Sequence, residues 1–166
     1  MPGRGRTPLL VSACLLGLNT KYDGQSNLNP DLAALQDDYV LIPVCPEQLG
    51  GLSTPRPAAE ISGGDGKDVL EGTAFVKTKC GEDRTAAFLQ GARETLKMAE
   101  TLGLKTAVLK ARSPSCGSGE IYNGSFSGGK KTGDGVCAAL LAREGITVYS
   151  EENINSLKNR FENGDS

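Results

Sequence analysis

The sequence predicts an α/β fold, a single open three-layer sandwich built on a mainly parallel sheet. Three observations predict it: apolar runs of strand length alternate with helical patterns, three of these runs each end at a cysteine, and no linker or low-complexity stretch divides the 166 residues. Strands that alternate with helices are typical of parallel sheets with crossover connections. A chain of this length is enough for one core, so we expect one domain over residues 1–166.

The first two strands are expected in the N-terminal quarter of the chain. An apolar run over residues 9–13 is expected to form the first strand, and a second apolar run over about 39–44 the second. Between them, Asn29 precedes Pro30, which is the pattern of an N-cap followed by proline at the first helical position. A short helix is therefore expected over about 30–36.

The middle of the chain changes from irregular structure to a long helix. Glycine pairs and a Pro-Arg-Pro segment predict a loop over residues 49–61, and residues 69–77 are expected to form an edge strand or hairpin arm. A helix is expected over 83–102, ended by Gly103. Its apolar residues recur every three or four positions, at Phe88, Ala92, Leu96 and Ala99.

The last third of the chain repeats the alternation. A strand over 106–109 stops at a Ser-Pro-Ser-Cys-Gly turn, because proline removes a backbone donor and glycine permits left-handed dihedrals. A glycine-rich loop over 117–135 follows, and then a helix over 136–143, a strand over 146–149 and a helix over 151–161. This order of elements is Rossmann-like. In such sheets the ligand crevice lies beyond the carboxyl ends of the strands.

Composition excludes several classes of function. The net charge of −2 argues against a phosphate-backbone partner, and 5% aromatic residues without tryptophan argue against a base-stacking surface. Only three apolar residues, 9–11, precede a cleavage-like Val-Ser-Ala-Cys segment, which is too few for a secretory signal. No stretch approaches the roughly 20 apolar residues of a membrane span. We expect a cytoplasmic protein that acts on a small molecule, with no polymeric nucleic acid or membrane as partner.

The cysteines are the main chemical feature of the sequence. Cys14, Cys45 and Cys116 each follow a predicted strand, so they are expected to meet at the ligand edge of the sheet. The total of five cysteines, with no C-x-x-C pair, favours free or metal-bound thiolates over a disulfide scaffold. Cys80 and Cys137 are expected to be small buried apolar residues.

Two kinds of metal site suit three convergent thiolates in a chain without histidine, namely zinc and an iron–sulfur cluster. Three protein ligands would leave one coordination position open, as in a catalytic site. Glu47, two residues after Cys45, would be either a fourth ligand or a base beside the open position. A non-catalytic zinc-binding module that uses the same three cysteines is therefore the alternative to an enzyme.

A second candidate site lies in the glycine-rich loop. Residues 124–130, Gly-Ser-Phe-Ser-Gly-Gly-Lys, nearly match a P-loop, but Lys131 stands where a P-loop needs Ser or Thr. Only this defective pattern would favour a nucleoside triphosphatase function. The segment is either an ordinary flexible loop or an anion-binding loop, backed by the N-terminus of the helix expected at 136–143.

Five motifs together resemble the thiouracil desulfidase family, in the order that the family has them. They are Val-Ser-Ala-Cys-Leu-Leu-Gly, Cys-Pro-Glu-Gln-Leu-Gly-Gly-Leu, Ser-Thr-Pro-Arg, Arg-Ser-Pro-Ser-Cys-Gly and Gly-Asp-Gly-Val, at residues 11–17, 45–52, 53–56, 112–117 and 133–136. The resemblance covers nearly the whole chain, and the Ser-Pro-Ser-Cys-Gly element is specific. Cys137 departs from it, since it stands where threonine is expected.

The resemblance implies an iron–sulfur enzyme. Carried over position by position, Cys14, Cys45 and Cys116 would hold a 4Fe–4S cluster with one iron not bound by protein. Glu47 and Ser113 would be the catalytic acid–base groups. The activity implied is removal of sulfur from a thiolated pyrimidine (thiouracil, thiouridine or its monophosphate), giving the oxo form and sulfide without net redox change.

The resemblance also implies a mechanism in which named residues activate water, relay a proton and contact the substrate. Water activated by Glu47 would attack the carbon that carries sulfur, and Ser113 would relay the proton. The phosphate of a thiolated nucleoside monophosphate is expected at the glycine-rich loop. Substrate contacts are expected from six residues in all: Tyr22, Asp23, Arg56, Ser125, Lys130 and Lys131.

Overall fold

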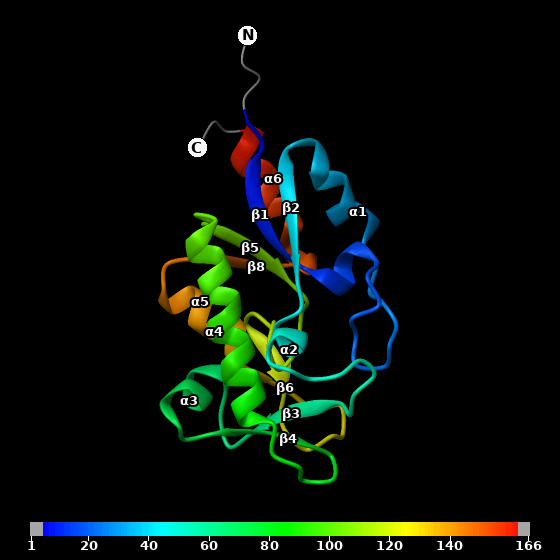
Figure 1. Cartoon of the computed structure of the whole chain (residues 1–166), viewed down its shortest axis with the longest axis vertical. Helices are drawn as coiled ribbons and strands as arrows, with labels where there is room; N and C mark the ends of the chain where they lie inside the picture. Colours follow the sequence, from blue (N-terminus) through cyan, green and yellow to red (C-terminus); the bar gives the residue numbers. More distant parts are fainter. Residues whose placement is uncertain (1–4, 163–166) are drawn as a thin grey trace.

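The computed structural model describes residues 5–162 and has a four-stranded sheet at its centre (Figure 1). All strand pairs in this sheet are parallel, and the strand order is β2-β1-β5-β8. The strands are β1 (Thr7–Ser12), β2 (Tyr39–Val44), β5 (Thr106–Leu109) and β8 (Thr147–Ser150). This confirms the predicted α/β class. The single domain predicted over 1–166 includes residues 1–4 and 163–166, which lie outside the described part.

Helices cover both faces of the sheet and so form the outer layers of the sandwich (Figure 1). Leu10 and Ala107 belong to one core cluster, whereas Leu9 and Val108 belong to the other, since successive strand side chains point to opposite faces. The first cluster also contains residues of α4 (Thr85–Thr101) and α5 (Val136–Arg143). The second contains residues of α1 (Pro30–Ala33), η2 (Ala34–Asp37) and α6 (Ile154–Glu162).

Local sequence signals account for the helices that were expected. The Asn29 side chain accepts a hydrogen bond from the Leu32 amide, so it caps α1 as predicted. Phe88 and Ala92 are buried on the apolar face of α4. Gly103 follows the end of this helix, as expected. Its φ of 65° lies in the left-handed region, which favours glycine. In the described range, no helix combines the length and apolar character that a membrane span needs.

Three segments of the chain differ from the prediction. The expected loop at 49–61 ends in β3 (Ala59–Ser62), and the expected strand at 69–77 is a helix, α3 (Gly66–Glu71), followed by β4 (Phe75–Thr78). Asp65 and Asp68 form a capping box that starts α3, and β3 pairs antiparallel with β4. The glycine-rich segment contains a hairpin, β6 (Glu120–Tyr122) and β7 (Lys130–Thr132). These elements form the lower half of Figure 1.

A close contact between two helices fixes the segment that follows β2. Cys45 is the N-cap of α2 (Pro46–Leu49), which packs on α4. A Cβ atom on Gly91 of α4 would lie 1.9 Å from the Pro46 carbonyl oxygen, and one on Gly50 would lie 2.0 Å from the Ala87 carbonyl oxygen. Only glycine at both positions allows this approach. The contact therefore determines where the Cys-Pro-Glu segment lies.

Candidate active site

A cavity of about 470 Å³ opens beyond the carboxyl ends of β1, β2 and β5, and Cys14, Cys45 and Cys116 all line it. The chain forms β2 on one side of β1 and then β5 on the other, so β1 marks the point where the strand order reverses. Ligand sites of open α/β sheets occur at such switch points. The structure thus brings the three predicted cysteines to one cavity. Glu60 of β3 and Tyr122 of β6 line its opposite wall.

The loop after β5 is held by groups from distant parts of the chain. Ser12 Oγ accepts a hydrogen bond from the Lys110 amide at 2.9 Å, which ties β1 to the start of the loop. The carboxylate of Glu151 pairs with the Lys110 ammonium and accepts from the Ala111 amide, both at 2.8 Å. Arg112 has a φ of 63°, a left-handed conformation that turns the chain into the Ser-Pro-Ser-Cys segment.

Ser113 and the N-terminus of α5 shape the rest of this loop. Ser113 Oγ accepts hydrogen bonds from the amides of Ser115 and Cys116, at 3.2 and 3.1 Å. The Val136 and Ala138 amides donate to the carbonyls of Pro114 and Ser115. These donors at the start of α5 therefore bind the loop itself. They hold the backbone just before Cys116, whose thiol lines the cavity.

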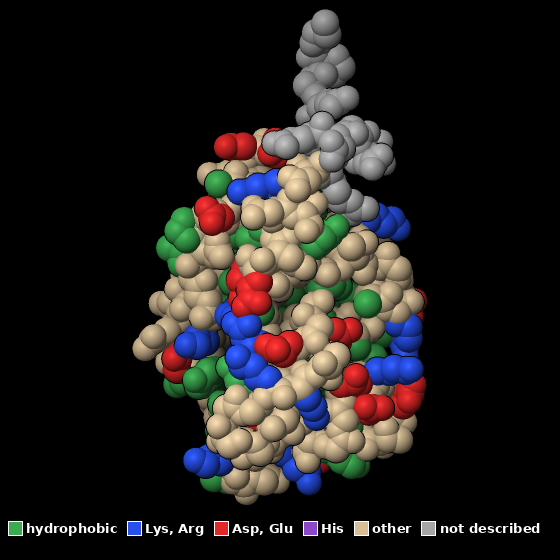
Figure 2. Space-filling model, turned by 180° about the vertical axis from the view of Figure 1, so that it is seen from behind, with side chains coloured by type: hydrophobic (Ala, Val, Ile, Leu, Met, Phe, Trp, Pro, Cys, Tyr) green, Lys and Arg blue, Asp and Glu red, His purple; other side chains and the backbone are tan. Residues whose placement is uncertain are grey.

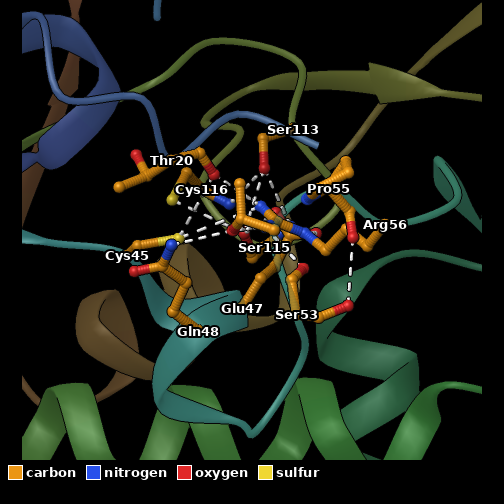
Figure 3. Close-up of polar contacts among 11 residues, drawn as sticks. Thr20, Cys45, Glu47, Gln48, Ser53, Pro55, Arg56, Ser113, Ser115 and Cys116 are labelled. Atoms are coloured by element: carbon orange, nitrogen blue, oxygen red, sulfur yellow. Dashed lines mark hydrogen bonds and ion pairs between the residues drawn. The ribbon is translucent and has the colours of Figure 1, made fainter. Parts of the chain in front are cut away.

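A short polar network lies beside Cys45 and Cys116 (Figure 3). One oxygen of Glu47 accepts from Arg56 Nε, and the other accepts from Ser115 Oγ, both at 3.3 Å. Ser115 Oγ also lies 3.0 Å from Ser113 Oγ and 3.5 Å from Cys116 Sγ, so its single proton can be donated to the carboxylate or to the sulfur. The two predicted catalytic residues are thus connected, but through Ser115 rather than directly. The carboxylate can accept a proton, and the hydroxyls can pass one on.

The three thiols differ in exposure, and burial raises the pKa of two of them. Burial raises the pKa of Cys14, and a hydrogen bond from Asn27 partly offsets this effect. Burial raises the pKa of Cys116 well above its usual value. A metal binds cysteine as the thiolate, so coordination would have to remove the thiol protons of Cys14 and Cys116. Each thiol also has a polar neighbour suited to a thiolate: Asn27 for Cys14, Arg56 for Cys45 and Ser115 for Cys116.

The donor set fits an iron–sulfur cluster better than a zinc ion with four ligands. Three soft thiolates and no histidine suit iron–sulfur chemistry. In the zinc alternative Glu47 would be the fourth ligand, and its oxygens would have to bind zinc in addition to accepting hydrogen bonds from Arg56 and Ser115. Among residues 5–162, no three His, Cys, Asp or Glu side chains are gathered as ligands of a single metal ion.

The prediction for the other two cysteines is half right. Cys137 is buried on the first turn of α5, where burial raises its pKa to about 12. Cys80 is exposed, so the prediction of a buried apolar residue is wrong there. It lies between β4 and the start of α4, in a turn where the Gly81 amide donates to the Thr78 carbonyl. A turn at the end of a short strand leaves such a side chain in solvent.

The residues expected to contact substrate separate into two groups. Tyr22 and Arg56 line the cavity. Asp23, Ser125, Lys130 and Lys131 are not among its lining residues. Asp23 pairs with Lys21 at 3.3 Å and accepts from the Gln25 amide, and Lys131 Nζ donates to the Ile61 carbonyl at 3.4 Å. Ser125 Oγ bonds to the side chains of Asn123 and Ser127.

The glycine-rich loop does hold an anion, but the anion belongs to the chain. Glu60 Oε1 accepts hydrogen bonds from the Gly124 and Phe126 amides, at 3.0 and 3.1 Å. Two of the loop amides are therefore engaged, as are the Val136 and Ala138 amides at the start of α5. These contacts argue against a phosphate at residues 124–130, and the phosphate site there stays a prediction. The partner was not evident because Glu60 lies 64 residues before Gly124.

The cations at the cavity each have a carboxylate partner. Lys110 pairs with Glu151, Arg112 with Glu152, and Lys21 with Asp23. Figure 2 shows the same mixture at the surface, where basic and acidic side chains alternate over the face in view. The pairs of Lys110 and Arg112 were not expected, since their partners lie about 40 residues further along the chain. Ser115 could have been found, because it lies in the same turn as Ser113.

Comparisons with known proteins agree with this arrangement. The family model described as 2-thiouracil desulfurase matches residues 9–153. The chain is 48% identical over 149 residues to the uncharacterized protein YbbK of Bacillus subtilis (strain 168), which covers 90% of this chain and 99% of that protein. A solved structure described as the [4Fe-4S]-dependent thiouracil desulfidase TudS is similar with a TM-score of 0.82 and 42% identity, over 95% of this chain and 99% of that one.

Proposed function

Because the chain belongs to the 2-thiouracil desulfurase family, we propose that it is a [4Fe–4S]-dependent thiouracil desulfidase. It replaces the sulfur of a thiolated pyrimidine by oxygen and releases sulfide. The observation that carries the proposal is the convergence of Cys14, Cys45 and Cys116 on one cavity, beside the carboxylate of Glu47. The similarity to TudS over nearly the whole chain supports it.

Cys14, Cys45 and Cys116 would hold the cluster, and the fourth iron would have no protein ligand. When bound, the cluster would supply a Lewis-acid position for which a soft thiocarbonyl sulfur is a suitable ligand. Burial of Cys116 would keep water from its sulfur, and the hydrogen-bond donors beside all three thiols would stabilise the thiolate form.

The acid–base work is assigned to the network around Glu47. Its carboxylate would accept a proton from a water molecule in the cavity, so that the water oxygen attacks the carbon that carries sulfur. Ser115 and Ser113 would pass protons between this carboxylate and the departing sulfur or the ring, because their hydroxyl oxygens lie 3.0 Å apart. Ser113 is held by two backbone amides as an acceptor, so its own proton is free to be donated.

The overall reaction needs no electron donor. A thiocarbonyl and water give a carbonyl and hydrogen sulfide: the carbon–sulfur bond breaks, a carbon–oxygen bond forms, and both protons of water end on sulfur or return to solvent. The carbon keeps its oxidation state, so the reaction is a hydrolysis of the carbon–sulfur bond.

The substrate range we propose is thiouracil, thiouridine or its monophosphate. A cavity of about 470 Å³ lies within the range of small-molecule sites. The rings of Tyr22 and Tyr122 provide apolar surface for a pyrimidine. A phosphate would meet Lys21, Lys110 or Arg112 at the cavity rather than Lys130 and Lys131.

Metal content separates the enzyme from the zinc module. Protein reconstituted anaerobically with iron and sulfide should show the visible absorbance of an iron–sulfur cluster and should convert 2-thiouracil to uracil. Cys14→Ser, Cys45→Ser and Cys116→Ser should each lose this absorbance. Cys80→Ser and Cys137→Ser are the controls and should keep it. Zinc bound in place of iron, with no uracil formed, would favour the module instead.

A further inference from the structure

Arg56 is the most completely engaged side chain at the cavity. Its side chain is only 5% exposed, and it pairs with Glu47 at 3.3 Å. A guanidinium has five N–H donors. Nε donates to Glu47, and Nη1 donates to the Ser53 carbonyl at 3.2 Å and to Thr54 Oγ1 at 2.7 Å. Nη2 donates to the Thr20 carbonyl at 2.8 Å and to Cys45 Sγ at 3.9 Å.

These contacts account for all five donors, so a substrate could bind Arg56 only by displacing one of them. They also connect three separate segments of the chain. The carbonyl of Thr20 belongs to the loop after β1, and Cys45 and Glu47 follow β2 (Figure 3). The third segment is the one just before Arg56 itself, which contains Ser53 and Thr54. In addition, the Arg56 amide donates to the Tyr22 carbonyl at 2.7 Å, which fixes the loop that carries Tyr22.

We propose that Arg56 is a positioning residue that holds the carboxylate of Glu47 in register with the thiol of Cys45. The planar guanidinium is itself fixed by three oxygens, on Thr20, Ser53 and Thr54, and presents its remaining donors to the base and to the candidate ligand. A lysine would keep the charge but not this fork of donors. The proposal rests on the proposed function and assigns Arg56 a role other than substrate contact.

Removal of the fork should affect catalysis rather than substrate binding. In Arg56→Lys the carboxylate of Glu47 keeps a positive neighbour but loses its fixed orientation. Loss of one charge-assisted hydrogen bond corresponds to roughly a 10- to 150-fold change. We expect kcat for 2-thiouracil to fall by about that factor, with KM and bound iron as in the parent protein. Thr54→Val removes one oxygen that fixes the guanidinium and should lower kcat less.

A second measurement needs no cluster. The free energy of unfolding of metal-free protein would be measured for Arg56→Gln, Glu47→Gln and the double variant. If the two residues are coupled, the double variant should lose less stability than the sum of the two single losses. Each single variant already removes the whole Arg56–Glu47 interaction, so the double variant cannot lose it twice. Arg84→Gln, which breaks an exposed ion pair with Glu82 away from the cavity, is the matched control and should show additive effects with Glu47→Gln.

The outcomes are distinct. A raised KM with unchanged kcat in Arg56→Lys would make Arg56 a substrate contact and overturn the proposal. Loss of bound iron in that variant would overturn it too, since the fall in kcat would then come from the lost cluster and not from the orientation of Glu47. Additive unfolding energies for Arg56 and Glu47 would remove the coupling. If the parent protein forms no uracil, the proposed function fails, while the unfolding cycle still tests the positioning of Glu47.

Discussion

Among the described residues, the hydroxyl of Ser115 is the one that contacts both the carboxylate of Glu47 and the thiol of Cys116. It is 1% exposed, so its hydroxyl is directed into the protein and not into solvent. Cys116 lies next to it in the chain, and Glu47 lies 68 residues away. The residue therefore joins the base, the predicted relay at Ser113 and one candidate cluster ligand within a few ångströms.

Glu47→Gln tests the assignment of the base. Glutamine is nearly isosteric but cannot accept a proton, so we expect a cluster content like that of the parent and turnover lower by roughly 10²-fold or more. Iron and sulfide analysis and the rate of uracil formation measure the two quantities. A near-parent rate would exclude Glu47 as the base.

Ser113→Ala should have a smaller effect on turnover than Glu47→Gln and an additional effect on stability. Its oxygen accepts from two backbone amides within the turn, and alanine leaves both without that acceptor. An unsatisfied buried group costs about 1–3 kcal/mol, so the midpoint of thermal unfolding should fall. The measurements are kcat and the unfolding midpoint of the same preparation. An unchanged midpoint would show that the turn does not depend on this hydroxyl.

At the scale of elements, the contact between α2 and α4 decides where the base lies. α2 has only four residues, so its position depends on its packing and not on its own stability. The facing glycines, Gly50 and Gly91, let the Pro46 carbonyl approach the α4 backbone. A change in α4 would therefore reach Glu47 through α2.

Gly91→Ala tests this dependence. Alanine in a helix normally stabilises a protein by about 0.4–1 kcal/mol relative to glycine. Here its Cβ atom would lie 1.9 Å from the Pro46 carbonyl oxygen, so α2 must shift. We expect lower stability and less bound iron, measured by thermal unfolding and iron analysis. Gly5→Ala, where a Cβ meets nothing within 4 Å, is the control. Unchanged iron content in Gly91→Ala would show that the ligand loop tolerates the shift.

The sequence predicted the elements that its own periodicity defines. The four strands of the parallel sheet and α4 were expected because each has a continuous apolar run or a regular apolar face. β7 was not expected, since its residues Lys130–Thr132 are polar and pair only with β6. The strand or hairpin arm expected over 69–77 overlaps the end of α3, which has few apolar residues and whose start depends on the reciprocal capping of Asp65 and Asp68.

In the candidate site, too, the part that follows from strand positions was predictable and the part that depends on long-range contacts was not. Cys14, Cys45 and Cys116 could be placed together because the carboxyl ends of parallel strands meet at one edge of a sheet. The role of Arg56 could not be predicted, because its partners include the carbonyl of Thr20, 36 residues away. The engagement of the glycine-rich loop by Glu60 depends on a similar long-range pairing.

At the scale of the whole molecule, balanced charge surrounds the cavity. Lys21, Lys110 and Arg112 line it, and each has an acidic partner. A site of this kind suits a small molecule that is neutral or bears a single charged group. A cytoplasmic location and a single domain over residues 1–166 stay predictions.

The double change Lys130→Ala with Lys131→Ala tests where a phosphate would bind. Both residues lie outside the lining of the cavity, and the loop amides between them and β6 bind Glu60. We therefore expect the KM values for thiolated base, nucleoside and monophosphate to stay as in the parent enzyme. A selective rise in KM for the monophosphate would restore the loop as the phosphate site.

The most direct test of the account is the fate of oxygen and electrons in one turnover experiment. Cluster-loaded protein would be incubated anaerobically with 2-thiouracil in isotopically labelled water, with no electron donor or acceptor, and uracil and sulfide would be quantified. The account predicts equal amounts of uracil and sulfide, with the label on the carbon that carried sulfur. Formation of uracil only when an electron donor is added, or uracil without the label, would contradict it.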